Sequence, residues 1–399
     1  MGVSKAIPRV PNGVLGERPL FTGKARPHYI SAPDRTVFQA SMDRVRWLFD
    51  EFDGKVSVST SGGKDSTVVL ELALAVAREK GCLPLTVVWL DQECEFQATV
   101  DYQRSVADRP DVDFRWYQVP FRLFNSTNHD DPWLNVWGEG EDWVREKEPD
   151  SIHDHNYYVG TGKRARKVDR FKELLNAINE DMGGAHLTGL RAEESPARRI
   201  SLGTNPGYKW VTWSSGGTAR DFYLFHPIYD WTFRDVWKAI HDNGWAYNAH
   251  YDHQFQYGVP VRNMRVSNYH HETALESLQY LQEVEPETWD KATKRLAGLN
   301  TQGHIGKNLL PDSLPYMFGS WDEYLRHLIE NLSANDEQKR TWYAMYKKVL
   351  DNTPKFWSED MAKKVAKAVV NNDLYGTTID MFLIDARRTL KIGRVSLDD

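Results

Sequence analysis

Two kinds of hydrophobic pattern alternate along the first part of the chain. Short, almost continuously apolar runs rich in β-branched and aromatic residues are typical of buried strands. Longer segments in which apolar residues recur every three or four positions are typical of helices with one buried face. The strand-like runs are 55–59, 85–90, 114–119, 185–190 and 222–225, and the helix-like segments are 38–52, 67–79, 99–109, 167–182 and 232–243. This alternation predicts an α/β fold built on a parallel sheet.

The pattern becomes purely helical in the last third of the chain. Helical spacing runs through 271–298, 320–334, 336–351 and 357–371, with prolines as punctuation. We therefore expect an α/β domain over 36–265 followed by a helical C-terminal domain over 266–399. Residues 1–35 are rich in Pro, Gly and Arg without periodicity, which predicts an extended arm. Residues 125–165 also lack periodicity and are expected to form a long loop or lid.

Composition and charge exclude some classes of protein. Hydrophobic residues make up 41% and charged residues 27% of the 399 residues, which is ordinary for a globular protein. The formal net charge of -6 disfavours broad, nonspecific binding of nucleic acid, because such binding needs a surplus of Lys and Arg. No apolar run approaches the ~20 residues that cross a bilayer, and the N-terminus lacks the apolar core of a signal peptide. These features predict a cytoplasmic protein without a membrane partner.

Cysteine and histidine usage limits the metal and redox chemistry. Cys82 and Cys94 are the only cysteines, so we expect no disulfide framework and no structural zinc. Cys82 is expected to be buried filler, and Cys94 has no recognisable catalytic partner. His250 and His253, with Asp252 between them, lack further ligands at zinc-like spacing, so metal binding is not favoured there. The segment 153–155, which carries two histidines, is interpreted in the same way.

The segment Ser61-Gly62-Gly63-Lys64-Asp65-Ser66 carries the clearest chemical signal. It lies between a predicted strand and a predicted helix, where glycines allow a polyphosphate to approach the backbone and a helix N-terminus offers unpaired N–H groups. Lys64 adds a positive charge and the serine hydroxyls add donors. The loop is not a Walker A loop, because the pattern Gly-x4-Gly-Lys-Ser/Thr is absent. The alternative is a glycine-rich turn without a ligand.

This loop resembles that of the PP-loop ATP pyrophosphatase superfamily, whose members cleave nucleotides between the α- and β-phosphates. Three further segments resemble the branch that contains phosphoadenosine phosphosulfate (PAPS) reductase and the ATP sulfurylase small subunit. They are Leu90-Asp91-Gln92-Glu93, the Gly-x-Arg segment 189–199 and His226-Pro227-Ile228-Tyr229-Asp230-Trp231-Thr232 with Asp235-Val236-Trp237. The resemblance spans about residues 36–260 and implies a doubly wound, mainly parallel sheet of the adenine nucleotide alpha hydrolase-like (HUP) type.

The resemblance also implies roles for individual residues. Lys64, Asp65 and Arg191 are the candidate catalytic residues, and Asp65 and Asp91 are candidate magnesium ligands. Asp91 alternatively caps a helix, Arg198 alternatively carries a solvated charge, and His226 is expected to be structural. The candidate ligand-binding residues for ATP or a related adenine nucleotide are Ser59, Ser61, Gly62, Gly63, Lys64, Asp65, Ser66, Asp91, Gln92, Gly189, Arg191 and Arg198.

The match to the reductases fails at the thiol. PAPS reductases use a C-terminal cysteine as the sulfur nucleophile, and related enzymes hold an iron–sulfur cluster on cysteine pairs. In the corresponding region this chain has Tyr257-Gly258-Val259-Pro260-Val261-Arg262-Asn263-Met264-Arg265, and no cysteine follows Cys94. We therefore expect no iron–sulfur cluster and no thiol-dependent reduction of a sulfonucleotide.

In its details the chain looks most like the immunoglobulin-binding regulator A (IbrA) type of PAPS-reductase-like protein from bacteria and prophages. That resemblance rests on segment 90–99 and on the long tryptophan-bearing insert, and it implies a ParB/sulfiredoxin-like partner. Three functions stay open: an enzyme that adenylates an unknown acceptor, a non-catalytic nucleotide sensor, and a sulfonucleotide enzyme that uses an external thiol. The basic segment 163–167 leaves nucleic acid open as a partner, and oligomerisation is open too.

Overall fold

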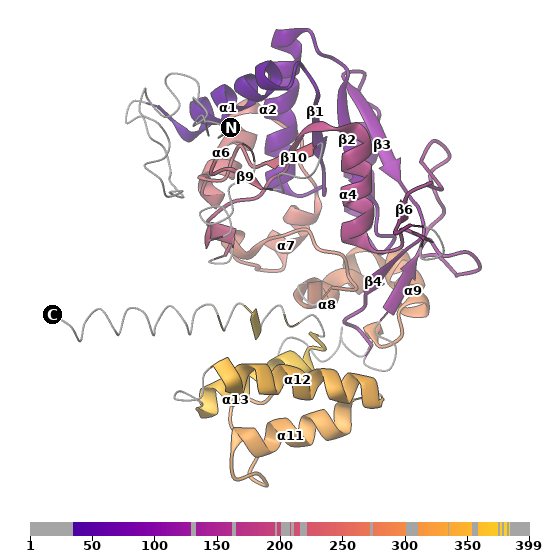
Figure 1. The fold of residues 1–399 in the computed structure, drawn as a ribbon, viewed down its shortest axis with the longest axis vertical. Helices are drawn as coiled ribbons and strands as arrows, with labels where there is room; N and C mark the ends of the chain where they lie inside the picture. The colour runs from indigo at the N-terminus through magenta and orange to yellow at the C-terminus, as the bar shows by residue number, and fades with distance from the viewer. Residues whose placement is uncertain are drawn as a thin grey trace, which may run out of the picture. The chain divides into compact units, whose positions relative to one another are not determined.

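A computed structural model describes most of the chain, with gaps. The described residues are 35–128, 133–161, 165–195, 198–200, 208, 211–215, 222–271, 274–300, 310–333, 335–352, 358–373, 376, 379–380 and 383. Apart from Arg35, the predicted N-terminal arm lies outside the described residues. They form two compact units, one of which contains 35–121, 137–141 and 146–266 (Figure 1). The other contains 122–136, 142–145 and the part after Val266.

A six-stranded sheet forms the centre of the first unit, in the order β3-β2-β1-β8-β10-β9. The first five of these strands are parallel, and only the edge strand β9 runs antiparallel to its neighbour β10. The strands are β1 (Val56–Ser59), β2 (Leu85–Leu90), β3 (Val112–Tyr117), β8 (Gly184–Leu187), β9 (Ser214–Ser215) and β10 (Phe222–Phe225). This confirms the predicted doubly wound, mainly parallel α/β fold.

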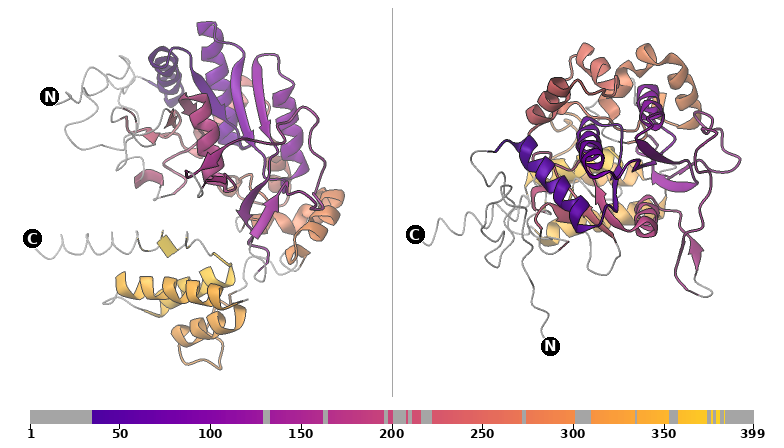
Figure 2. Two further views of the ribbon diagram at one scale, coloured as in Figure 1. Left: turned by 45° about the vertical axis from the view of Figure 1, so that its right-hand side comes forward. Right: turned by 90° about the horizontal axis from the view of Figure 1, so that it is seen from above.

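The strand order reverses at β1. From β1 the chain adds β2 and β3 on one side, and it then crosses over to add β8 and β10 on the other. Because crossovers between parallel strands are right-handed, such a reversal puts helices on both faces, and Figure 2 shows α2 and α3 on one side of the sheet and α4 on the other. Ligands of doubly wound folds bind beyond the carboxyl ends of the strands at such a reversal. A ligand of this fold is therefore expected at the carboxyl ends of β1 and β8.

Helices of the first unit follow the predicted periodic segments with shifted ends. The main shift is that α2 begins at Lys64 and not at Thr67, so Lys64 and Asp65 belong to its first turn. The short helix α7 was not predicted. The helices are α1 (Val37–Glu51), α2 (Lys64–Lys80), α3 (Gln97–Ala107), α4 (Phe171–Met182), α6 (Phe233–Asn243) and α7 (His250–Gln256).

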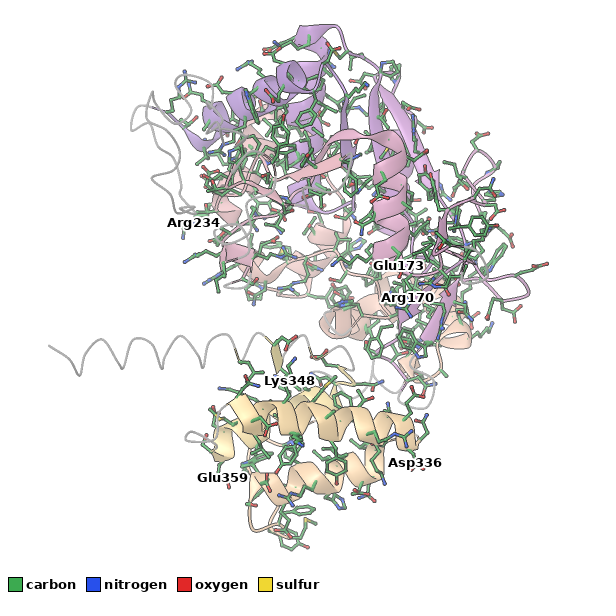
Figure 3. The ribbon with its side chains drawn as sticks, viewed as in Figure 1. Arg170, Glu173, Arg234, Asp336, Lys348 and Glu359 are labelled. Carbon is green, nitrogen blue, oxygen red and sulfur yellow. The ribbon has the colours of Figure 1, made fainter. Side chains whose placement is uncertain are left out.

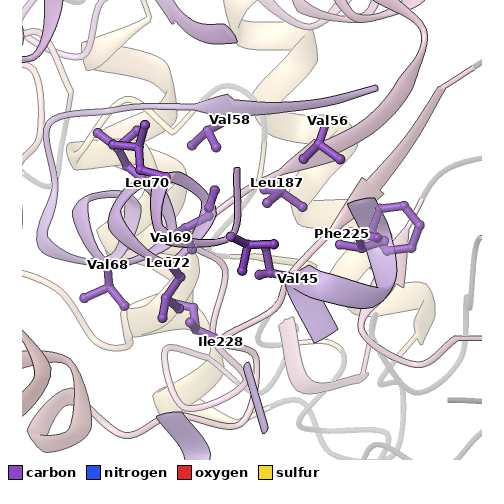
Figure 4. Packing of buried hydrophobic residues seen from close by; sticks show 14 of the residues in the cluster. Val45, Val56, Val58, Val68, Val69, Leu70, Leu72, Leu187, Phe225 and Ile228 are labelled. Carbon is purple, nitrogen blue, oxygen red and sulfur yellow. The ribbon is translucent and has the colours of Figure 1, made fainter. Parts of the chain in front are cut away.

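The apolar core of this unit joins the sheet to α1, α2 and α6. Val58 of β1, Val69 of α2 and Leu187 of β8 are fully buried within it (Figure 4). Each buried aliphatic side chain of this kind contributes about 1.5–3 kcal/mol relative to exposure. The strand that leads into the loop 61–66 is therefore fixed by packing against this core.

An ion pair inside this core gives the segment 226–232 its structural role. Both guanidinium NH groups of Arg44 on α1 donate to the Asp230 carboxylate, at 2.7 and 2.6 Å, and both side chains are completely buried. Arg44 and Ser41 also donate to the Pro227 carbonyl oxygen, at 2.7 and 2.8 Å. Loss of one partner of such a pair leaves an uncompensated buried charge. The segment therefore fastens α1 to the end of β10.

The second unit is helical. Its described helices are α8 (Leu275–Val284), α9 (Pro286–Arg295), α11 (Trp321–Leu332), α12 (Asp336–Asn352) and α13 (Glu359–Val370). Leu325, Trp342 and Val365 belong to an apolar cluster shared by α11, α12 and α13. Ion pairs lie on the surface, such as Lys348 with Asp380 at 2.6 Å. Figure 3 labels Lys348 on α12. The helical C-terminal region predicted from periodicity is confirmed.

The segment 125–165 differs most from its sequence-based description. Within and beside it, β4 (Phe121–Phe124) pairs with β5 (Trp133–Val136), and β6 (Tyr158–Val159) pairs with β7 (Arg166–Lys167). These strands were missed because each has only two to four residues, too few to establish a two-residue period. Among the described residues, no helix is both long and apolar enough to span a membrane.

Candidate nucleotide site

The loop between β1 and α2 is compact and closed by its own side chains. The Ser61 N–H donates to Ser66 Oγ at 3.2 Å, and the Gly62 N–H donates to Thr60 Oγ1 at 3.2 Å. The Gly63 N–H faces Ser61 Oγ at 3.4 Å. Gly62 has a φ of 70°, a left-handed value that favours glycine. Hydroxyls that can rotate away thus hold the loop's amides, which is suited to an anion that competes for the same N–H groups.

Gly189 brings the end of β8 against the first turn of α2. A Cβ atom at this position would lie 2.6 Å from the Asp65 carbonyl carbon and 2.7 Å from the Ser66 nitrogen. Both neighbours are backbone atoms of a helix, so they cannot move aside cheaply. Only glycine allows the end of β8 to lie this close to α2. The close contact places Arg191, two residues later, beside the loop.

Asp65 bridges two buried cations at this point. Arg191 Nε donates to Asp65 Oδ1 at 2.5 Å, and Lys64 Nζ lies 3.3 Å from Asp65 Oδ2. The side chains of Lys64 and Arg191 are 6% and 5% exposed, so their charges are little screened by water. Arg191 also donates to Glu193 Oε2 at 2.8 Å. The three candidate catalytic residues therefore meet in one cluster.

Positive charge is crowded at the N-terminus of α2. Burial lowers the pKa of Lys64, and the neighbouring Arg191 and Arg265 lower it further, whereas Asp65 raises it. Burial likewise lowers the pKa of Arg198, whose charge interacts with those of Asp65, Arg191 and Arg265 and which pairs with Glu194. A bound polyanion would relieve this repulsion, and the positive end of the helix dipole acts in the same direction.

The end of β2 has a different character. Asp91 is fully buried, and its Oδ2 accepts hydrogen bonds from Trp116 Nε1 at 2.7 Å and Gln118 Nε2 at 3.0 Å. Its Oδ1 accepts from the Glu93 N–H at 2.9 Å, within a turn in which Glu93 has a φ of 65°. The N-cap of the following helix α3 is Phe96, so Asp91 does not cap it. The carboxylate holds the strand end together, and Gln92 lies in the same turn.

The carboxylates of Asp65 and Asp91, the predicted magnesium ligands, already have protein partners. Both carboxylate oxygens of Asp65 face cations, and both oxygens of Asp91 accept hydrogen bonds from the protein. No group of three or more His, Cys, Asp or Glu side chains that could hold a metal occurs in the part of the chain that the structure describes. As arranged, these two carboxylates do not fit direct ligation of a metal by the protein, and their role as magnesium ligands stays a prediction.

Residues around α7 contribute to the site and were missed. The Tyr251 hydroxyl accepts the Lys64 N–H at 2.9 Å, and Asn248 Nδ2 donates to the Gly62 carbonyl oxygen at 3.2 Å. Lys64 Nζ donates to the Met264 carbonyl oxygen at 3.1 Å. The available sequence signal is a three-residue spacing of hydrogen-bonding side chains at 248, 251 and 254, which are all buried.

The remaining candidates lie near the site in supporting roles. His226 is buried between two hydroxyls, Thr188 Oγ1 at 2.7 Å and Ser215 Oγ at 2.9 Å, and burial lowers its pKa to about 3. His250 packs against Phe96 with a ring separation of 4.0 Å, and burial lowers its pKa to about 3 as well. Both histidines are therefore neutral at physiological pH. Ser59 ends β1 and is partly buried.

Neither cysteine presents a thiol to the loop's surface. Cys94 lies near the carboxyl end of β2 but is fully buried. Cys82 precedes the first residue of β2, Leu85, and so lies at the amino ends of the parallel strands, opposite the loop.

Comparison with known proteins decides the family. The Phosphoadenosine phosphosulfate reductase domain matches residues 55–257, which is just over half of the chain. The chain belongs to this family. The remainder, 258–391, matches a Domain of unknown function (DUF3440). The boundary between the two matches falls inside the first compact unit, which extends to Val266.

Relatives of this PAPS reductase domain protein include characterised and uncharacterised proteins. The Uncharacterized protein YbdN of Escherichia coli is 26% identical over 371 residues, which cover 85% of this chain and 89% of YbdN. The Adenosine 5'-phosphosulfate reductase of Staphylococcus saprophyticus is 23% identical, over 57% of this chain and 79% of that enzyme. The finer assignment to the IbrA type stays a prediction.

Solved structures of similar chains include two fungal enzymes. The PAPS reductase of Candida auris gives a TM-score of 0.32 at 14% identity and covers 58% of this chain and 89% of its own. The FMN adenylyltransferase of Candida glabrata gives a TM-score of 0.33 at 15% identity, covering 55% of this chain and 61% of its own. These TM-scores are too low to carry an argument about mechanism.

Proposed function

We propose that this PAPS reductase domain protein binds ATP, or a related adenine nucleotide, and cleaves the α–β phosphate bond to adenylate an acceptor. The observation that carries the proposal is the cluster that the Gly189 contact assembles at the reversal of strand order. There Lys64 and Arg191 are buried on either side of Asp65, at the N-terminus of α2. Buried cations at the N-terminus of a helix are suited to a nucleotide polyphosphate.

The chemistry follows from that arrangement. A nucleophilic atom of the acceptor attacks the α-phosphorus, the bond from that phosphorus to the bridging oxygen breaks, and pyrophosphate leaves with the electron pair. Lys64, Arg191 and the loop amides stabilise the negative charge that accumulates on the leaving pyrophosphate. A magnesium ion that arrives with the nucleotide would supply further neutralisation of the phosphate charge, and no residue of this chain is assigned to hold it. The acceptor's proton passes to solvent.

The thiol inventory favours this reaction over sulfonucleotide reduction. Reduction needs a sulfur nucleophile, and the chain has only the buried Cys94 and the distant Cys82. The protein would therefore need an external thiol to act as a reductase. Adenylation needs no thiol from the chain.

The test is calorimetric titration with ATP, PAPS and adenosine 5'-phosphosulfate in magnesium, with release of pyrophosphate followed in parallel. Lys64→Ala should weaken ATP binding by about 30- to 100-fold, because it removes a charge-assisted hydrogen bond. Lys80→Ala is the matched control, since Lys80 is a surface residue at the other end of α2. Because burial lowers the pKa of Lys64, binding of a polyanion should raise it again. Wild-type protein should therefore take up protons on binding at alkaline pH, and Lys64→Ala should not.

The alternatives give other results. Binding of ATP without release of pyrophosphate would favour a nucleotide sensor, for which the IbrA-type resemblance implies a ParB/sulfiredoxin-like partner. Preference for PAPS or adenosine 5'-phosphosulfate over ATP would favour sulfonucleotide chemistry with an external thiol. Failure to bind any of the three nucleotides would overturn the proposal.

A further inference from the structure

The segment 264–266 lies against the loop although it belongs to the match with the domain of unknown function. It is fastened there from two sides. Lys64 Nζ donates to the Met264 carbonyl oxygen at 3.1 Å. The Tyr251 hydroxyl makes backbone hydrogen bonds with both Lys64 and Val266, and the tyrosine is 2% exposed. One buried side chain therefore fixes the segment relative to the first residue of α2.

Gln254 fixes Arg265 within this segment through the backbone alone. Gln254 Oε1 accepts the Arg265 N–H at 3.0 Å, and Gln254 Nε2 donates to the Arg265 carbonyl oxygen at 2.7 Å. This pair of bonds imitates pairing between two strands, and Gln254 is 2% exposed. The position of the Arg265 backbone is therefore set without use of its guanidinium group.

The guanidinium of Arg265 is an exposed charge beside other cations. Among the described residues it makes no ion pair, although acidic residues accompany both Arg191 and Arg198. Its charge lowers the pKa of Lys64 and that of Arg198, so it acts electrostatically on the loop cluster. Holding an unpaired cation near two others is unfavourable without an anion. Such an arrangement is expected where an anionic ligand supplies the missing negative charge.

We propose that Arg265 is a fourth cation of the nucleotide site, positioned by α7 to contact the phosphate or phosphosulfate chain. The inference rests on the proposed function. It assigns a phosphate-binding residue to the part of the chain that matches the domain of unknown function. Asn248, Tyr251 and Gln254 are positioning residues, which connect Gly62, Lys64 and Arg265 through one short helix and its N-terminal flank.

The experiment compares Arg265→Ala with Arg262→Ala by calorimetric titration with inorganic pyrophosphate, ATP and adenosine, each at low and high salt. Arg262 is the matched control, because it is an exposed arginine three residues earlier, outside the segment 264–266. Arg265→Ala should weaken pyrophosphate and ATP about tenfold, reduce the salt dependence, and leave adenosine unchanged. Arg262→Ala should stay within about twofold of wild type. Arg265→Lys should recover part of the affinity, because it retains the charge.

Folding does not confound this comparison, since Gln254 bonds the backbone of residue 265 and not its side chain. Gln254→Ala then tests positioning: it should weaken pyrophosphate binding while Arg265 itself is present. If wild type binds the nucleotide and Arg265→Ala behaves like Arg262→Ala, the inference is wrong and the proposed function stands. If wild type binds neither ATP nor pyrophosphate, both are wrong.

Discussion

The carboxyl ends of β1 and β2 lie at the same edge of one sheet, but their polar groups have different partners. After β2, the Asp91 carboxylate accepts three protein hydrogen bonds and is completely buried. After β1, serine, threonine and tyrosine hydroxyls hold the loop's amides. Two cations, Arg191 and Arg265, and one carboxylate, Asp65, act on the charge of Lys64. At the end of β2 the protein satisfies the polar groups with its own hydrogen bonds. At the end of β1 the excess of cations leaves room for a bound anion.

This difference shows that sequence position alone does not identify a binding residue. An acidic residue after a parallel strand is a reasonable nucleotide contact, because ligands of such folds bind at that edge. Burial and hydrogen bonding decide whether its charge is available to a ligand. By this criterion Asp91 supports the strand end, whereas the assignment of Lys64, Asp65 and Arg191 to a nucleotide site stays a prediction.

Asp91→Ala should have the largest effect on stability. It removes the acceptor for Trp116 Nε1, Gln118 Nε2 and the Glu93 N–H in a place closed to water, and unsatisfied buried donors are costly. We expect a loss of about 3 kcal/mol in the free energy of unfolding, measured by urea titration. Asp101→Ala, at an exposed acid on α3, should cost less than about 0.5 kcal/mol. Equal losses in the two variants would contradict the structural role of Asp91.

Gly189→Ala should affect both folding and binding. The added methyl would meet backbone atoms of α2 at 2.6 Å, and relief of that contact has to move the helix start or Arg191. We expect a loss of stability of about 2 kcal/mol together with weaker ATP binding. Gly319→Ala is the control, because a Cβ there would meet only the end of the flexible Glu323 side chain. Normal stability and affinity in Gly189→Ala would show that the ends of β1 and β8 need no such close approach.

Much of the fold could be predicted from the sequence, because it is set by local pattern. Apolar runs and helical spacing gave the parallel strands and their helices, and the loop 61–66 follows β1 as expected. Gly189 contacts the backbone of Asp65 and Ser66, so the fold brings these two predicted segments together, and their shared role in binding a ligand stays a prediction. The strands and helices depend on residues close together in the sequence. The position of the loop depends on a short motif that directly follows a predicted strand.

What could not be predicted depends on contacts between residues far apart in the chain. The bond from Lys64 to Tyr251 joins residues 187 positions apart, and no local pattern encodes it. The hydrogen bonds that Asp91 accepts likewise depend on Trp116 of β3 and on Gln118, which directly follows that strand. The strands β4 to β7 were missed because they contain two to four residues each, too few to establish a period.

Tyr251→Phe should have the smallest effect and gives the sharpest distinction between the two strand ends. It deletes one hydroxyl and keeps the ring that lies beside Lys64 Nζ, so the core should stay packed and stability should fall by only about 1 kcal/mol. The Lys64 amide would lose its acceptor, and the loop would have to be ordered by the ligand itself. We therefore expect about fivefold weaker ATP binding in calorimetry, while Tyr247→Phe, which loses only a surface bond to Asp252, binds normally. A gain in affinity would mean that the Lys64 N–H binds the phosphate once it no longer donates to Tyr251. The hydrogen bond from α7 would then oppose nucleotide binding and not support it.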